Sequence, residues 1–438
     1  LEAGEHTLTF IIESAGIEFQ DTVTLQLASE VPFPEPQAGW KRYESDCCLY
    51  YTISGTAADR DIETITEITD MQAASVTDLM GVEFEEPVEI TLLPRVLGHG
   101  GFARGEIFVT YSDRKYAGGL YMNVIHHEMV HILDSRLESE FRPTLFVEGL
   151  AVYLTGGHFK QEELIPRAAA LLAPGQVESG LGLDWYIPME DLADQFYTSQ
   201  HEIGYLQAGA LIEYMIERWG YDDFNDFYRS IPSPENGSQL EVIDLALIEH
   251  FGIDFAQLEV DFIERLQDES VTENEVDDVR LLVEYYDTAR RYQQLLDTSA
   301  YFLTAWLPNS ETMREDGIVA DFLRHPEDAI HISLETMLVF SDQALQTESF
   351  AELEELLIAT NQVLDAIQAG KPQPFSVNPL AEDHFAVTQR ILETGYEPFS
   401  IDIELQEAFV MATYQNEEPS QFFLTSSGDE WIIQSLSD

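Results

Sequence analysis

The stretch IHHEMVHILDSRLESEFRPTLFVEGLAVY, residues 125–153, decides how the middle of this chain folds. Apolar residues recur through its first part at helical intervals, so we expect a helix from about Gly119 to Leu137. A second helix is expected to begin after Pro143. Gly156 and Gly157 are expected to end it, as glycines commonly do. The stretch therefore predicts two consecutive helices, and the chemistry of the chain is concentrated on them.

The first helix carries the pattern H-E-x-x-H, formed by His127, Glu128 and His131. At 3.6 residues per turn, the two histidines stand one above the other on the same helix face. Two imidazoles in that position can both bind one zinc ion at about 2.0–2.1 Å. Glu128 lies about 100° round the helix, where it can touch a metal-bound water without binding the metal. The pattern predicts a zinc site with Glu128 as its general base.

A catalytic zinc ion normally takes three protein ligands and leaves a fourth position for water. A metzincin would place glycine and histidine where Asp134 and Leu137 stand, so that class is excluded. The better third ligand is Glu148, one turn into the second helix and flanked by apolar residues, with Gly149 allowing the two helices to pack closely. The alternative is that Glu148 is a solvated glutamate favoured by the helix dipole.

These motifs resemble those of a known family. H-E-x-x-H followed by E-G-x-A-x-Y on the next helix is similar to the gluzincin peptidases, particularly the bacterial group called peptidase MA-like. The matching residues are His127, Glu128, His131, Glu148, Gly149, Ala151 and Tyr153. A looser likeness downstream extends the resemblance over about residues 40–270. The resemblance implies an α+β catalytic domain, made of a small mixed sheet and a helical subdomain, that hydrolyses peptides with one zinc ion.

The resemblance also implies that a strand edge above the metal helix holds the peptide by adding it as a further strand. The segment in the right place is 105–111. The gluzincin aminopeptidases carry Gly-x-Met-Glu-Asn on that edge, and this pattern is missing here. We therefore expect endopeptidase action on a peptide or protein substrate.

Tyr205 stands where the aminopeptidase branch has its oxyanion-stabilising tyrosine, although the spacing to the next glycine departs by one residue. His201 could share that role. The alternatives are a core tyrosine and a surface histidine. Asp134 could orient a ligand histidine or cap the helix end. His126 is expected to be structural, and His99 is expected to lie in a loop.

The chain divides by pattern into three parts. Residues 1–36 form a β-hairpin of immunoglobulin-like type and a proline-rich linker, 37–270 the zinc peptidase domain, and 271–438 a mainly helical domain ending in short strands. Helices are expected at 203–218, 222–230, 239–250, 254–268, 275–306, 328–345 and 348–369. Strands are expected at 7–13, 17–27, 49–54, 88–93, 106–111, 400–414, 420–425 and 430–434, with hairpin turns at 14–16 and 427–429.

The composition is strongly acidic. Against 81 Asp and Glu stand 21 Lys and Arg, a formal charge of −60. Such a surface repels nucleic acid and anionic lipid, so neither is an expected partner. The charge indicates either a solvated coat or a preference for basic substrates.

No apolar run reaches the roughly 18 residues of a membrane helix. The chain begins at Leu1 instead of Met, so we expect an upstream signal or anchor to have been removed and an extracellular or cell-envelope location. The only cysteines, Cys47 and Cys48, are neighbours, which does not suit a metal motif. We expect two unreactive thiols, with a disulfide between neighbours as the alternative.

Two rival functions remain open. The first is a catalytically inactive gluzincin relative that binds peptides without cleaving them. The second is an envelope interaction protein in which the hairpin and the C-terminal region mediate attachment. The metal motifs lie wholly in the middle region. The activity of that region therefore distinguishes the two rival functions from a peptidase.

Overall fold

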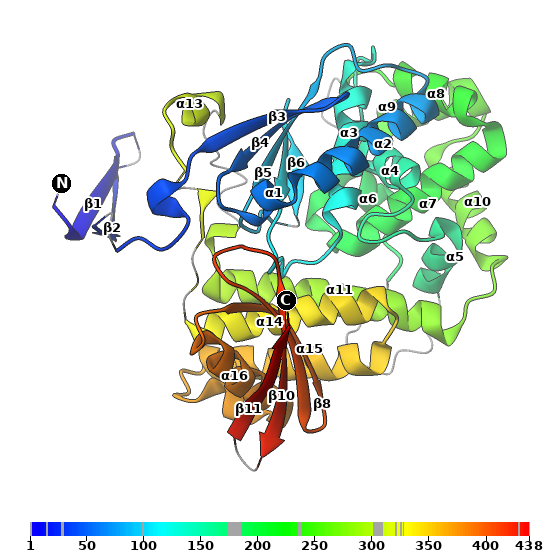
Figure 1. Cartoon of the computed structure of the whole chain (residues 1–438). Helices are drawn as coiled ribbons and strands as arrows, with labels where there is room; N and C mark the ends of the chain where they lie inside the picture. Colours follow the sequence, from blue (N-terminus) through cyan, green and yellow to red (C-terminus); the bar gives the residue numbers. More distant parts are fainter. Residues whose placement is uncertain are drawn as a thin grey trace.

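The computed structural model describes residues 2–14, 16–27, 30–98, 100–172, 185–234, 239–300, 310–319, 322–324, 326, 328–427 and 430–437. His99, and the turn residues Ala15, Gly428 and Asp429, lie outside this description. The chain is of the expected mixed α+β class, with a five-stranded sheet among helices in the middle and a four-stranded sheet at its end (Figure 1). Among the described helices, none combines the length and the apolar character needed to cross a membrane.

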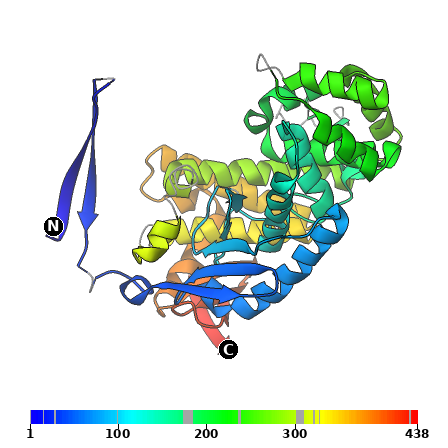
Figure 2. The same ribbon diagram turned by 90° about the horizontal axis from the view of Figure 1, so that it is seen from above.

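The N-terminal hairpin is confirmed. Strands β1 (Gly4–Ile12) and β2 (Ile17–Leu25) pair antiparallel as a two-stranded sheet that stands apart from the rest in both views (Figures 1 and 2). One face gathers apolar residues, and Phe10 and Phe19 on it are more than half exposed, at 51% and 59%. The immunoglobulin-like character of the hairpin stays a prediction.

The central sheet has the strand order β3-β4-β5-β7-β6. Its strands are β3 (Trp40–Glu44), β4 (Cys48–Ile53), β5 (Val88–Leu93), β6 (Gly101–Ala103) and β7 (Ile107–Thr110). β4, β5 and β7 run parallel, and the two edge strands are antiparallel to their neighbours. Both edge strands are additional to the strands expected here.

The sheet is covered on both faces, because alternate residues of a strand point to opposite sides. Leu92 and Val109 belong to the core formed with α2 (Ile62–Met80) and the helices beyond it. Leu93 and Phe108 face a separate core to which Phe322 contributes. Residues from the C-terminal part of the chain therefore close the second face of the sheet.

Helix α3 (Tyr121–Arg136) and helix α4 (Thr144–Thr155) are the two expected helices of the central stretch. The expected role of Gly149 was wrong. A Cβ atom there would lie 2.7 Å from the Ala208 carbonyl oxygen on α7 (His201–Trp219), so Gly149 allows α4 to approach α7 and not α3. Gly149 is one position beyond Glu148, and the 100° turn of the helix directs it to a different neighbour.

Shorter helices complete the middle region. They are α1 (Ala57–Arg60), α5 (Leu164–Ala169), α6 (Met189–Gln195), α8 (Tyr221–Ser230), α9 (Gln239–Phe251) and α10 (Phe255–Gln267). The helices expected at 222–230, 239–250 and 254–268 are confirmed.

The C-terminal region is mainly helical, as expected. Its helices are α11 (Glu273–Leu296), α13 (Ser310–Glu315), α14 (Ala329–Gln346), α15 (Phe350–Gln368) and α16 (Pro379–Leu392). The helix expected at 275–306 instead stops at Leu296. Its C-cap residue Asp297 is buried, accepts a hydrogen bond from Tyr116 and forms an ion pair with Arg324. The helical pattern of the sequence does not reveal these contacts.

The terminal strands form a four-stranded antiparallel sheet in the order β11-β10-β9-β8. Its strands are β8 (Glu397–Glu404), β9 (Glu407–Thr413), β10 (Ser420–Ser427) and β11 (Glu430–Ser437). The single strand expected at 400–414 was wrong. Leu405, with a φ of 56°, occupies the left-handed region and turns that segment into two paired strands. The terminal hairpin is therefore half of a larger sheet that packs on α16.

The boundary expected near residue 270 stays a prediction, because α11 contributes to two cores. Val276, Val279 and Val283 pack with the middle region. Leu282 and Tyr285 on the same helix pack with α14 and α15. Helix α11 therefore joins the two regions along its length, as Figure 1 shows.

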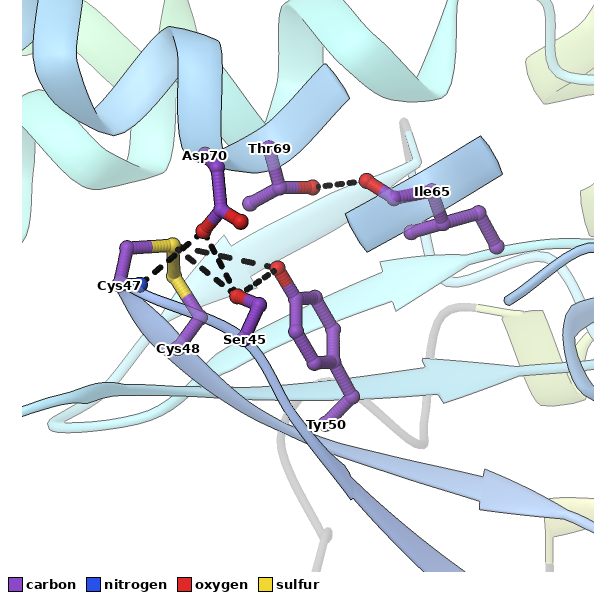
Figure 3. The surroundings of a disulfide bond; sticks show 7 residues. All are labelled: Ser45, Cys47, Cys48, Tyr50, Ile65, Thr69 and Asp70. Carbon is purple, nitrogen blue, oxygen red and sulfur yellow. Dashed lines mark hydrogen bonds between the residues drawn. A yellow bond between two sulfur atoms is a disulfide. The ribbon is translucent and has the colours of Figure 1, made fainter. Parts of the chain in front are cut away.

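The expectation of two separate thiols was wrong, because Cys47 and Cys48 form a disulfide (Figure 3). Asp70 holds the turn that precedes β4. Its carboxylate accepts hydrogen bonds from the Cys47 backbone N–H at 3.0 Å and from the Ser45 hydroxyl at 2.7 Å. The Tyr50 hydroxyl lies 3.2 Å from the same Ser45 oxygen. The arrangement depends on a helix α2 residue far along the chain, which the adjacent cysteines alone do not indicate.

Candidate metal centre

The two histidines of α3 and the glutamate of α4 converge on one point. Glu148 Oε2 lies 3.3 Å from His127 Nε2 and 3.1 Å from His131 Nε2. The three candidate ligand atoms all lie within 4.8 Å of one another. His127 and Glu148 are buried and His131 is half-buried. The structure thus brings together the two histidines expected from their spacing and the glutamate expected from its helix context and the family resemblance.

These separations suit a tetrahedral zinc ion. Ligand atoms about 2.0–2.1 Å from such an ion lie about 3.3–3.4 Å from one another. The distances from Glu148 to the two imidazole nitrogens have this size. The donor set, two imidazoles and one carboxylate, is also one that catalytic zinc sites use. The alternative of a solvated Glu148 was wrong, since its side chain is only 7% exposed.

Tyr197 completes the surroundings of Glu148 and was not anticipated. Its hydroxyl donates a 2.6 Å hydrogen bond to Glu148 Oε1, the carboxylate oxygen that does not face the histidines. Such a bond orients a metal-binding carboxylate. Tyr197 lies in the short 3-10 helix η3 (Phe196–Thr198), 49 residues after Glu148, and no local pattern links the two.

Glu128 lies beside the three converging residues without joining them. Its side chain is buried, and burial raises its pKa to about 7, while the backbone N–H of Ala103 opposes the shift. A carboxylate that titrates near neutral pH suits a group that takes and returns a proton. The position agrees with that expected of a general base.

Ala103 lies on β6, and this corrects the expected peptide-binding edge. Segment 105–111 forms β7, which is flanked by β5 and β6, so the edge strand beside α3 is β6. The backbone groups of Gly100 and Arg104 bond toward β7. Alternation along an antiparallel ladder therefore turns the N–H and C=O groups of Gly101 and Ala103 away from β7. On that side the Ala103 N–H bonds to Glu128. The glycine-rich sequence hid this short strand.

The charges of the ligand residues follow from their burial and contacts. Burial lowers the pKa of His127 to about 4. Burial also opposes protonation of His131, but Glu148 outweighs it and raises that pKa to about 9. Burial would raise the pKa of Glu148, yet His131 and His127 hold it well below its usual range. An anionic carboxylate between two imidazoles is a favourable place for a cation to bind.

Tyr205 on α7 lies close to the converging residues. Its ring centroid is 6.0 Å from that of His127, and the ring stacks on His158 at 3.9 Å. Burial raises its pKa well above the usual range, so the hydroxyl keeps its proton. The structure places Tyr205 at the site, and its role in stabilising an oxyanion stays a prediction.

His201 was expected at the surface if it had no role, and that alternative was wrong. Its side chain is only 15% exposed and is packed between the rings of Tyr205 and Tyr286. Together with His158 and Glu202 it forms a second group whose ligand atoms lie within 4.8 Å of one another. His158 comes from the loop after α4 and was not anticipated.

Asp134 neither orients a ligand histidine nor caps the helix with its side chain. It is buried and accepts from Arg142 at 2.8 Å, from Tyr228 at 3.0 Å and from Arg229. These partners tie α3 to α8 and to the segment before α4. His126 is half-buried, belongs to neither histidine group, and has its pKa lowered by burial.

Comparison with known proteins adds no relative. No protein-family profile matches the sequence, and no curated protein sequence is similar to it. The likeness to gluzincin peptidases therefore rests on the motif residues and their arrangement, which place two imidazoles, a carboxylate and a buried glutamate at one point of the molecule.

Proposed function

We propose that this protein is a zinc-dependent peptidase of gluzincin type. One observation carries the proposal: His127, His131 and Glu148 converge within ligand distance of one another, with the buried Glu128 beside them. Helices α3 and α4 must pack together to produce that arrangement. A purely structural use of these residues does not explain why a second buried glutamate, Glu128, lies next to a His–His–Glu cluster.

His127, His131 and Glu148 would hold the zinc ion. When bound, zinc lowers the pKa of a water ligand toward about 7 and polarises a carbonyl group. Glu128 takes the proton of the attacking water and delivers it to the leaving amine. Tyr205 keeps its hydroxyl proton and is proposed to donate it in a hydrogen bond to the developing oxyanion.

Strand β6 is the proposed peptide-binding edge. Its outward backbone groups at Gly101 and the Ala103 carbonyl can pair with an extended peptide as an added strand, while the Ala103 N–H is bonded to Glu128. Main-chain pairing grips the middle of a chain without needing a free amino terminus, which supports an endopeptidase. The acidic surface favours approach of basic segments. We also propose an extracellular or envelope location, which the Cys47–Cys48 disulfide supports because such bonds persist in oxidising surroundings.

The test is Glu128→Gln in the full chain, with Glu138→Gln, an exposed glutamate after α3, as the matched control. We expect Glu128→Gln to lower the rate of peptide-library cleavage by about 10²–10⁴-fold and to keep its zinc. The control should match the native chain in both measurements. Full activity of Glu128→Gln would overturn the assignment of the base. Zinc binding by the native chain with no cleavage would favour the inactive, peptide-binding relative.

A further inference from the structure

A second group of metal-ligating side chains lies next to the proposed centre. His158 follows α4, while His201 and Glu202 begin α7. Glu202 Oε2 lies 3.3 Å from His158 Nδ1, and Glu202 Oε1 lies 3.7 Å from His201 Nε2. We propose that these three residues form a second zinc site, distinct from that of His127, His131 and Glu148.

The donor set is the first argument. Two imidazoles and one carboxylate are the same three donors as in the first cluster, and zinc accepts this combination. The first cluster therefore serves as an internal reference. Its carboxylate-to-imidazole distances are 3.1 and 3.3 Å, against 3.3 and 3.7 Å in the second. The two histidines of the second cluster approach different oxygens of Glu202, so zinc binding there requires the carboxylate to turn one oxygen between them or to bind through both.

Burial is the second argument. The Glu202 side chain is only 4% exposed, and those of His158 and His201 are 19% and 15% exposed. A buried carboxylate needs a compensating positive charge. Among the described residues, the ion pairs of Glu202 are with two histidines, whose positive charge requires protonation. A divalent cation supplies the charge while the imidazoles remain neutral ligands.

The rings around the cluster hold its ligands in place. His158 stacks on Tyr205, and His201 stacks on Tyr286 at 4.9 Å with the ring planes 2° apart. Among the described residues, another histidine–carboxylate pair, His331 with Asp328, belongs to no group of three metal-ligating side chains. The second cluster thus has a third donor and a rigid frame that an ordinary ion pair lacks.

The second zinc ion would position the first site. His158 contacts the His127 ring at a centroid distance of 5.5 Å and also stacks on Tyr205. Zinc bound by His158, His201 and Glu202 would join the loop after α4 to the start of α7. That connection fixes Tyr205, one helical turn after His201, beside His127. The inference concerns metal binding and does not depend on the peptidase activity.

The test counts tightly bound zinc in the full chain by elemental analysis after dialysis against zinc buffered with a competing chelator. The chelator excludes the weak carboxylate sites of the acidic surface. We expect two zinc ions per native chain, one in Glu202→Gln, one in His131→Ala and none in the double variant. His331→Gln is the control and should keep two. Circular dichroism checks that each variant is folded.

One tightly bound zinc ion in the native chain, or two in Glu202→Gln, would overturn the second site and leave His158 and Glu202 as a plain ion pair. If Glu202→Gln does not fold, His201→Gln tests the same site. Two zinc ions in a chain that cleaves no peptide would refute the proposed function and leave this inference standing. Peptidase activity in a chain that binds a single zinc ion would support the proposed function and overturn the second zinc site.

Discussion

The two His–His–Glu clusters of this molecule contain the same donors but hold them differently. In the first, both histidines project from one turn of α3 and share one oxygen of Glu148. In the second, His158 comes from a loop and approaches a different Glu202 oxygen from the one nearest His201. Both histidines of the second cluster are partly exposed, whereas His127 of the first is buried. Regular helix geometry thus sets the relative position of the two histidines in the first cluster. In the second cluster, the position of His158 depends on the conformation of its loop.

The difference suggests separate duties. A cluster built on packed helices keeps its ligands rigid, as a catalytic centre requires. A cluster that joins a loop to a helix gains most from metal binding, because the ion supplies the connection. Both clusters contact Tyr205 through a histidine ring, so a change in one is expected to reach the other.

The largest effect is expected from His131→Ala. Removing one of three ligands should release the first zinc ion and lower peptidase activity to background. The neighbouring His126→Gln is the matched control and should keep the metal and the activity. Activity measurement with zinc analysis decides the matter. Substantial cleavage by His131→Ala would show that the first cluster is not the catalytic one.

The next largest effect is expected from Gly157→Ala, which should impair zinc binding at the second cluster alone. Gly157 has a φ of 135°, and a Cβ atom there would collide with the Lys160 carbonyl oxygen, so the loop carrying His158 must move. We expect the second zinc ion to be lost and the first to stay. Gly156→Ala is the control, because Gly156 also has a positive φ, of 76°, but its Cβ would meet the flexible end of Gln161 instead of a backbone atom. Equal zinc content in the two variants would contradict the proposed dependence on the loop.

His384 shows what burial does to a histidine that has no carboxylate beside it. It is fully buried on α16, neither ring nitrogen has a hydrogen-bond partner among the described residues, and burial lowers its pKa to about 3. Below pH of about 6.5 the unfolded chain binds a proton there and the folded chain does not. This residue therefore makes the free energy of unfolding fall as the pH drops from about 6.5 toward 3.

His384→Leu should flatten this dependence by up to about 1.4 kcal/mol per pH unit within that range. Denaturant titrations of both chains between pH 7.5 and 5 measure the difference. Parallel curves for the two chains would contradict the prediction. In the two clusters, by contrast, facing carboxylates are available to compensate for burial.

The smallest effect is expected from Tyr197→Phe. The substitution removes the hydrogen bond to Glu148 Oε1 and leaves the three first-cluster ligands in place. Loss of such an outer partner should weaken zinc binding about tenfold, near the lower end of the usual range. Tyr186→Phe removes a tyrosine–glutamate bond, to Glu259, in which neither residue is a ligand of either cluster, and is the control. Competition with a zinc chelator gives the ratio, and an unchanged affinity would exclude this role of Tyr197.

Much of the fold could be predicted where pattern and packing agree. The helices α8, α9 and α10 and strand β5 lie where their periodicities indicated. Strands β3 and β6 were not expected, because short edge strands show little alternation. The helix ending at Leu296 and the turn at Leu405 were also missed. Both depend on single residues whose conformation or partners lie outside the periodic signal.

The sequence by itself determined the histidine pair of the first cluster, since a four-residue spacing on a helix places His127 and His131 on one face whatever surrounds them. The apolar context of Glu148 likewise indicated burial. Only the tertiary structure decided that Tyr197 supports Glu148, that β6 is the open edge, and that His158 meets His201 and Glu202. The physical reason is sequence distance: helix geometry relates residues within a few positions, whereas contacts across 44 or 49 residues depend on how whole elements pack.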